Sequence, residues 1–170
     1  MNYPMNYLGE FLAQWSATRA GVLAEAERIP ADKFDFRATT ATRSVREVLQ
    51  HIVESERALT AELCRDDTDL RRVFAPYAKD AKVQAATTKE ALLALLRSSL
   101  AECQVLLRQA GAEKFTQTIT GLDGQPVSKR AMLEFTVSHE MYHRGQLTVY
   151  ERMLGIEPAL TEQFRRLVNP

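Results

Sequence analysis

Cysteine, glycine and long apolar runs are all scarce in this sequence. The 170 residues include only two cysteines, Cys64 and Cys103, which are too few and too isolated for a disulfide framework. We expect both to be reduced thiols. The seven glycines are dispersed, so they form no glycine-rich loop that could cradle a phosphate group. No run approaches the roughly 18 apolar residues of a membrane-spanning helix, and no membrane association is expected.

An excess of charge of either sign is also missing. The 22 basic and 22 acidic residues give a formal net charge of zero. Such a chain has no global electrostatic attraction for nucleic acid, so no nucleic-acid partner is expected. The first residues have neither the basic start nor the apolar stretch of a signal peptide. We therefore expect a cytoplasmic protein of a single domain over residues 1–170, long enough to bury a core.

Four long segments show the apolar periodicity of α-helices. They begin near Asn6, Ser44, Thr87 and Ser128, and they end near Arg28, Leu63, Gly111 and Leu154. The first is stopped by Pro30, because the residue before proline disfavours helical backbone. Ser44-x-x-Glu47 and Thr87-x-x-Glu90 have the spacing of a helix-capping box. Gly155 is placed to terminate the fourth helix.

The connections indicate how these helices are arranged. The link from Arg65 to Ala86 is long, contains Pro76 and has room for a short helix. A link of that length can run back along a bundle, which would make the second and third helices parallel. Residues 114–127 alternate and then turn at 122–125, which predicts a small hairpin or an extended loop. The sequence thus predicts an all-α four-helix bundle with a long crossover between helices 2 and 3.

The chain has only three histidines, and their positions along the helices are informative. His139 and His143 lie one turn apart on one face of the fourth helix. We assign to this inward face Met132, Phe135, Tyr142, Gln146, Leu147, Tyr150, Met153 and Leu154. The opposite, outward face then holds Arg130, Glu134, Arg144, Thr148, Glu151 and Arg152.

Two neutral imidazoles one turn apart form a ready bidentate ligand for a divalent transition metal. The alternative is a pair of core histidines, each satisfied by a hydrogen bond to a neighbour. His51, in the middle of the second helix, favours the metal. Facing helices of a bundle lie close enough for it to complete a site of His51, His139 and His143. Three protein ligands leave a position open for water or substrate.

The run from His139 to Leu147, HEMYHRGQL, together with the earlier His51, resembles the DinB/YfiT superfamily. The resemblance covers nearly the whole chain. It implies an up-down-down-up four-helix bundle, a divalent metal bound by these three histidines, and frequent homodimers. Zinc and nickel are the ions that we expect. Characterised relatives include thiol-dependent S-transferases and isomerases, so a low-molecular-weight thiol and an unidentified small-molecule substrate are the implied partners.

The same residues also spell H-E-x-x-H, the signature of zinc peptidases, with Glu140 as the general base and Glu162 as a third ligand. Arg144 and Gly145 do not fit the extended pattern. Pro158 separates the motif from Glu162, which we place in a tail.

A non-enzymatic, metal-binding dimer is another interpretation. In it, Val137 and Met141 would contact the partner from the outward side of the fourth helix. We favour metal-dependent chemistry on a small molecule. Three neutral ligands leave the ion its full charge, which favours an anionic ligand such as a thiolate.

Overall fold

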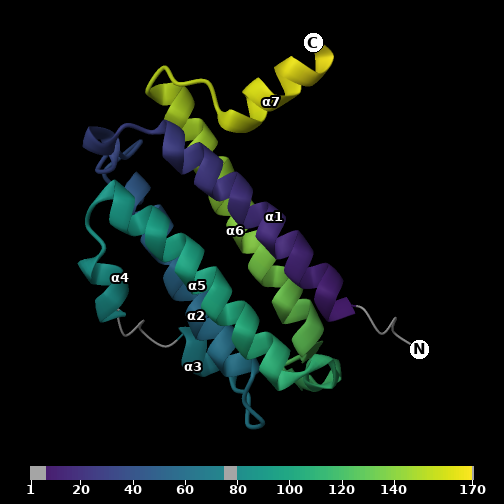
Figure 1. Cartoon of the computed structure of the whole chain (residues 1–170). Helices are drawn as coiled ribbons and strands as arrows, with labels where there is room; N and C mark the ends of the chain where they lie inside the picture. Colours follow the sequence, from purple (N-terminus) through teal and green to yellow (C-terminus); the bar gives the residue numbers. More distant parts are fainter. Residues whose placement is uncertain (1–6, 75–79, 170) are drawn as a thin grey trace.

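The computed structural model describes residues 7–74 and 80–169, and four long helices dominate it (Figure 1). These are α1 (Tyr7–Arg28), α2 (Val45–Leu63), α5 (Lys89–Ala110) and α6 (Lys129–Met153). The shorter helices are α3 (Leu70–Phe74), α4 (Ala81–Ala85) and α7 (Ala159–Val168), with 3-10 turns η1 (Ala31–Lys33) and η2 (Ala112–Thr116). Strands β1 (Thr118–Thr120) and β2 (Pro126–Ser128) form an antiparallel hairpin. Of the two predicted alternatives, a small hairpin or an extended loop, the structure contains the hairpin.

The four long helices run up, down, down and up along one bundle (Figure 1). Helices α2 and α5 are parallel neighbours, and α6 packs against both α1 and α2. The crossover between α2 and α5 carries the short helices α3 and α4. Pro76 of this crossover lies outside the described residues. The predicted bundle topology is confirmed.

Local capping signals explain where these helices begin. The capping box at Ser44 is present: its hydroxyl accepts from Glu47 N, and the Glu47 carboxylate accepts from Ser44 N at 2.7 Å. The predicted start at Thr87 is wrong by one residue, because it is the Thr88 side chain that accepts from Ala91 N. Ser128 caps α6. Gly155 follows it with φ +75°, a backbone conformation that glycine adopts without strain.

Two apolar clusters fill the bundle, one toward each end. One cluster is formed mainly by Val22, Val48, Ile52, Leu96 and Leu147 with their neighbours. The other includes Phe11, Trp15, Leu63, Leu107 and Leu133. Between them, at the middle of the bundle, lie the buried polar side chains of Arg19, Glu56, Ser99 and Glu140. The middle of the bundle is therefore a polar layer. His51, His139 and His143, the predicted site residues, lie at the same height along the bundle.

The predicted faces of α6 are partly wrong. Tyr142 and Met153, assigned inward, are 65% and 55% exposed, whereas Val137, assigned outward, is buried. The helical periodicity also places Glu151 outward, whereas the structure buries it fully. Because α6 packs against both α1 and α2, its buried surface is wider than one stripe and includes Val137 and Glu151. The described part of the chain contains no helix that is long and apolar enough to span a membrane.

The end of the chain also differs from the prediction. The sequence predicts a tail at Glu162, but this residue lies in α7, which begins directly after Pro158. Glu162 forms ion pairs with Arg28 of α1 and with Arg166. Helix α7 crosses the end of the bundle, away from the middle of α6 (Figure 1).

Candidate metal site

The three histidines come together at the middle of the bundle. His51 lies on α2, and His139 and His143 lie on α6. The Nε2 atom of His139 is 3.1 Å from Nε2 of His51 and 3.0 Å from Nε2 of His143. One potential ligand atom of each residue lies within 4.8 Å of the others. An ion about 2.1 Å from each nitrogen would set neighbouring ligand atoms roughly 3.0–3.4 Å apart, so the cluster could hold a metal.

Neighbouring polar groups orient two of the imidazoles. The Gln146 side-chain oxygen lies 2.8 Å from Nδ1 of His143. An amide oxygen only accepts, so Nδ1 of His143 donates, and its Nε2 keeps the lone pair that faces His139. The Ser55 hydroxyl lies 3.4 Å from Nδ1 of His51. With the outer nitrogens engaged in this way, the inner nitrogens are the ones that face each other, which is the arrangement that a shared ion requires.

Electrostatics keeps the histidines neutral. Burial, with the positive charge of Arg43 and the two other histidines, lowers the pKa of His51 to about 3. Burial, His143 and Arg43 lower the pKa of His139 to about 4. Burial also lowers the pKa of His143, against the hydrogen bond to Gln146. At neutral pH all three are uncharged imidazoles, the form that ligates metals.

Glu140, adjacent to His139 in the sequence, faces the core. Its side chain is 1% exposed. One carboxylate oxygen accepts from Nε1 of Trp15 at 2.6 Å, and the other accepts from Nε of Arg19 at 3.0 Å. Arg19 also pairs with Glu56. Glu140 does not line the pocket beside the histidines. Its two oxygens are thus committed to the α1 side chains, which does not suit the general base of a zinc peptidase.

Two pockets adjoin the histidines. Toward the end of α2 lies an apolar pocket of about 200 Å³ that His51 and His139 share with Leu59, Val73 and Phe135. The Phe135 ring centroid is 5.8 Å from that of His139. Toward the start of α2 lies a polar pocket of about 480 Å³, which His51 shares with Arg37, Thr40, Thr42, Arg43, Gln50 and Glu54.

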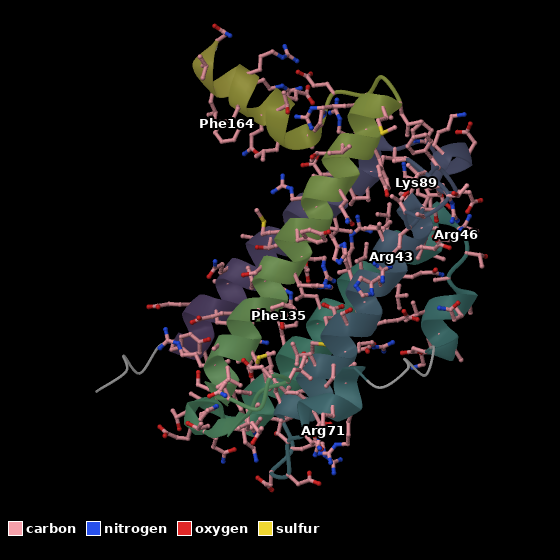
Figure 2. The ribbon with its side chains drawn as sticks, turned by 180° about the vertical axis from the view of Figure 1, so that it is seen from behind. Arg43, Arg46, Arg71, Lys89, Phe135 and Phe164 are labelled. Carbon is pink, nitrogen blue, oxygen red and sulfur yellow. The ribbon has the colours of Figure 1, made fainter. Side chains whose placement is uncertain are left out.

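Sequence reasoning identified the three histidines but missed the residues around them. The sequence pattern assigns no functional role to Arg43 or Glu56. It places Phe135 on the inward face, whereas the structure leaves this side chain 44% exposed in the lining of the apolar pocket. Figure 2 shows Arg43 beside α2 and Phe135 on α6. A usable signal existed for one of them, because Arg43 immediately precedes the Ser44 cap, two turns before His51.

Comparison with known proteins places this geometry in a family. A model of the DinB family matches residues 1–167. The chain belongs to the DinB family. A similar sequence is the uncharacterised protein YjoA of Bacillus subtilis strain 168. It is 26% identical to this chain over 132 residues, which are 76% of this chain and 79% of YjoA.

Solved structures of DinB-like proteins share the fold. The crystal structure of B. subtilis YjoA has a TM-score of 0.65 at 20% identity, covering 86% of this chain and 92% of YjoA. B. subtilis YfiT, described as a probable metal-dependent hydrolase with an unusual four-helix bundle topology, has a TM-score of 0.61 at 17% identity, covering 92% of each chain. A mycothiol-dependent maleylpyruvate isomerase has a TM-score of 0.66 at 16% identity, covering 82% of this chain and 60% of the isomerase.

Proposed function

We propose that His51, His139 and His143 bind one divalent metal ion, and that this site activates a small-molecule ligand. The observation that carries the proposal is the convergence of three Nε2 atoms from two helices, with neighbouring atoms 3.0 and 3.1 Å apart. Zinc or nickel suits a ligand set of imidazoles. Three protein ligands leave a coordination position for a reactant, as in reactive rather than purely structural sites.

A thiol is the reactant that we propose. When bound, a divalent ion lowers the pKa of a coordinated thiol or water. The three imidazoles contribute no negative charge, and Arg43 adds a positive charge nearby, so the protein favours an anion at this position. The likeness in fold to a mycothiol-dependent enzyme supports the same chemistry. A thiol held here would meet a second reactant in the apolar pocket beside Phe135, as an S-transfer or isomerisation reaction requires.

The thiol would have to come from solution. Cys64 caps the far end of α2, more than three turns from His51. Cys103 is buried among apolar side chains, and burial raises the pKa of its thiol to about 12. Both cysteines are free, but neither lines the two pockets next to the histidines.

Hydrolysis of a substrate by metal-bound water is the alternative suggested by the description of YfiT. It would need a group that accepts a proton from the water. Glu140 is engaged by Trp15 and Arg19, and the Glu56 carboxylate is held by Arg19 and Ser99. A coordinated thiol also loses a proton, but its intrinsic pKa is far below that of water, so the ion alone would suffice to release that proton to solvent, and for that reason we prefer the thiol chemistry. A homodimer and a cytoplasmic location stay predictions from the sequence.

Metal stoichiometry tests the proposal. The purified chain, loaded with Zn²⁺ and freed of excess ion, should contain about one ion per chain by elemental analysis. His143→Ala should lose tight binding, because two remaining imidazoles hold an ion far more weakly. Ser138→Ala is the matched control, since Ser138 is exposed on the same helix and bonds only to the Glu134 carbonyl. An unchanged zinc content in His143→Ala would refute the site.

A further inference from the structure

The polar pocket beside His51 contains an arginine that no carboxylate neutralises. Arg43 is exposed, and its side chain forms no hydrogen bond or ion pair with any other described residue. Every other arginine donates at least one side-chain hydrogen bond to a described residue. A guanidinium that is left unpaired in a protein with so many ion pairs is available to a ligand.

The acidic groups of this pocket are already engaged. Glu47 accepts from Ser44 N at 2.7 Å and pairs with Arg37 at 3.3 Å. Glu54 accepts from Nε2 of Gln84 at 2.9 Å. The amide of Gln84 leaves the negative charge of Glu54 in the pocket, but neither carboxylate bonds to Arg43, so this guanidinium has no ion-pair partner among the described residues.

The backbone of Arg43 is held in place. Its carbonyl oxygen accepts a hydrogen bond from the Tyr150 hydroxyl of α6 at 2.8 Å. The next residue, Ser44, is fixed by the capping box of α2. Arg43 is thus tied to both helices that carry the histidines, and its side chain lies on the same side of the bundle as Phe135 (Figure 2). A ligand with one end at the histidines can place its other end at Arg43.

We propose that Arg43 determines specificity by binding the carboxylate of a thiol ligand whose sulfur occupies the open position at the histidines. A carboxylate carries one negative charge and matches a guanidinium with two parallel hydrogen bonds. A phosphate dianion would call for a second unpaired cation, and Arg37 is already paired with Glu47. This inference rests on the proposed metal site and names the chemical class of its ligand.

Paired thiols that differ only in charge test the role of Arg43. The full-length chain is loaded with one equivalent of Co²⁺ and titrated with four thiols. Two are carboxylates, mercaptopropionate and mercaptohexanoate, and two are the uncharged alcohols of the same lengths, mercaptopropanol and mercaptohexanol. The dissociation constants come from the sulfur-to-cobalt charge-transfer band. For at least one length, the carboxylate should bind about tenfold more tightly than the alcohol, which is typical of a charge-assisted hydrogen bond. Arg43→Gln should reduce this ratio to about one, and Arg43→Lys should retain part of it.

Arg46→Gln is the matched control. Arg46 lies in the first turn of α2, three residues after Arg43, but pairs with Asp35 at 2.9 Å and does not line the pocket, so this variant should keep the tenfold ratio (Figure 2). A ratio that persists in Arg43→Gln would overturn the role of Arg43 and leave the thiol site intact. Binding of Co²⁺ without a response to any of the four thiols would overturn both the inference and the thiol chemistry. Failure to bind Co²⁺ would refute the metal site itself.

Discussion

Glu140 illustrates how a motif and its geometry can separate. In the sequence it completes H-E-x-x-H. In the structure its carboxylate accepts hydrogen bonds from Trp15 and Arg19 of α1 and lies 1% exposed. Buried carboxylates are stable only where donors or opposite charges surround them. Glu140 thus links α6 to α1 through the polar layer, beside the histidines but directed away from them.

Removal of this carboxylate should therefore weaken the fold. Glu140→Ala leaves Arg19 with Glu56 as its remaining ion-pair partner and should lower the free energy of unfolding by roughly 3 kcal/mol, measured in urea. Glu134→Ala removes an exposed glutamate from the same helix and should change it by less than about 1 kcal/mol.

Activity assays separate this role from that of a peptidase base. We expect no cleavage of unfolded peptides by the metal-loaded chain. Metal-dependent peptide cleavage that disappears in Glu140→Gln, while the variant keeps its metal, would establish Glu140 as a general base and contradict the structural role.

At the scale of elements, the buried carboxylate of Glu25 joins α7 to the bundle. Glu25 of α1 accepts hydrogen bonds from the first amides of α7, at Ala159 and Leu160, and pairs with Arg144 of α6. Neither oxygen of the neighbouring Glu151 accepts a hydrogen bond from the described residues. Burial and the charge of Glu25 raise the pKa of Glu151 to about 8, against the weaker opposing effects of Arg28 and Arg152.

The stability of the chain should depend on pH through Glu151. In the unfolded chain the carboxyl loses its proton near its ordinary pKa of 4.5, whereas the folded state keeps the proton up to about pH 8. The contribution of this group is thus complete below about pH 4.5 and is lost as the pH rises to about 8. Glu151→Gln should flatten the fall of stability across this window in thermal melts. A fall of the same slope in the variant would assign it to other groups.

The sequence was informative about helix ends and less so about helix faces. Ser44, Ser128 and Gly155 act through bonds to their own neighbours, so local spacing was sufficient to find them. The burial of Arg144 and Glu151 depends on Glu25, more than a hundred residues away, and no periodicity can reveal such a partner. Arg43 is different, because its place directly before the Ser44 cap, two turns ahead of His51, is a local signal; only the hydrogen bond from Tyr150 of α6 to its carbonyl could not be found from spacing.

For the whole molecule, the exposed apolar surface of α6 bears on the predicted homodimer. Tyr142, Val149 and Met153 are each more than half exposed and lie on one side of the helix. If a second copy of the chain covers these three side chains, their exposure in the isolated chain is explained. Light scattering should then give a mass of twice 19.2 kDa for the wild type. Val149→Asp should shift the mass toward that of the monomer, and the Ser138→Ala variant should not. A wild-type monomer would contradict the homodimer.

The central claim is that three histidines from two helices share one ion. Its most direct test is a crystal structure of the zinc-loaded chain, with anomalous diffraction recorded on both sides of the zinc absorption edge. We predict one anomalous peak per chain, about 2.0–2.2 Å from Nε2 of His51, His139 and His143, with at least one further ligand that is not from the protein. No peak among these atoms, or a peak at other residues, would contradict the account.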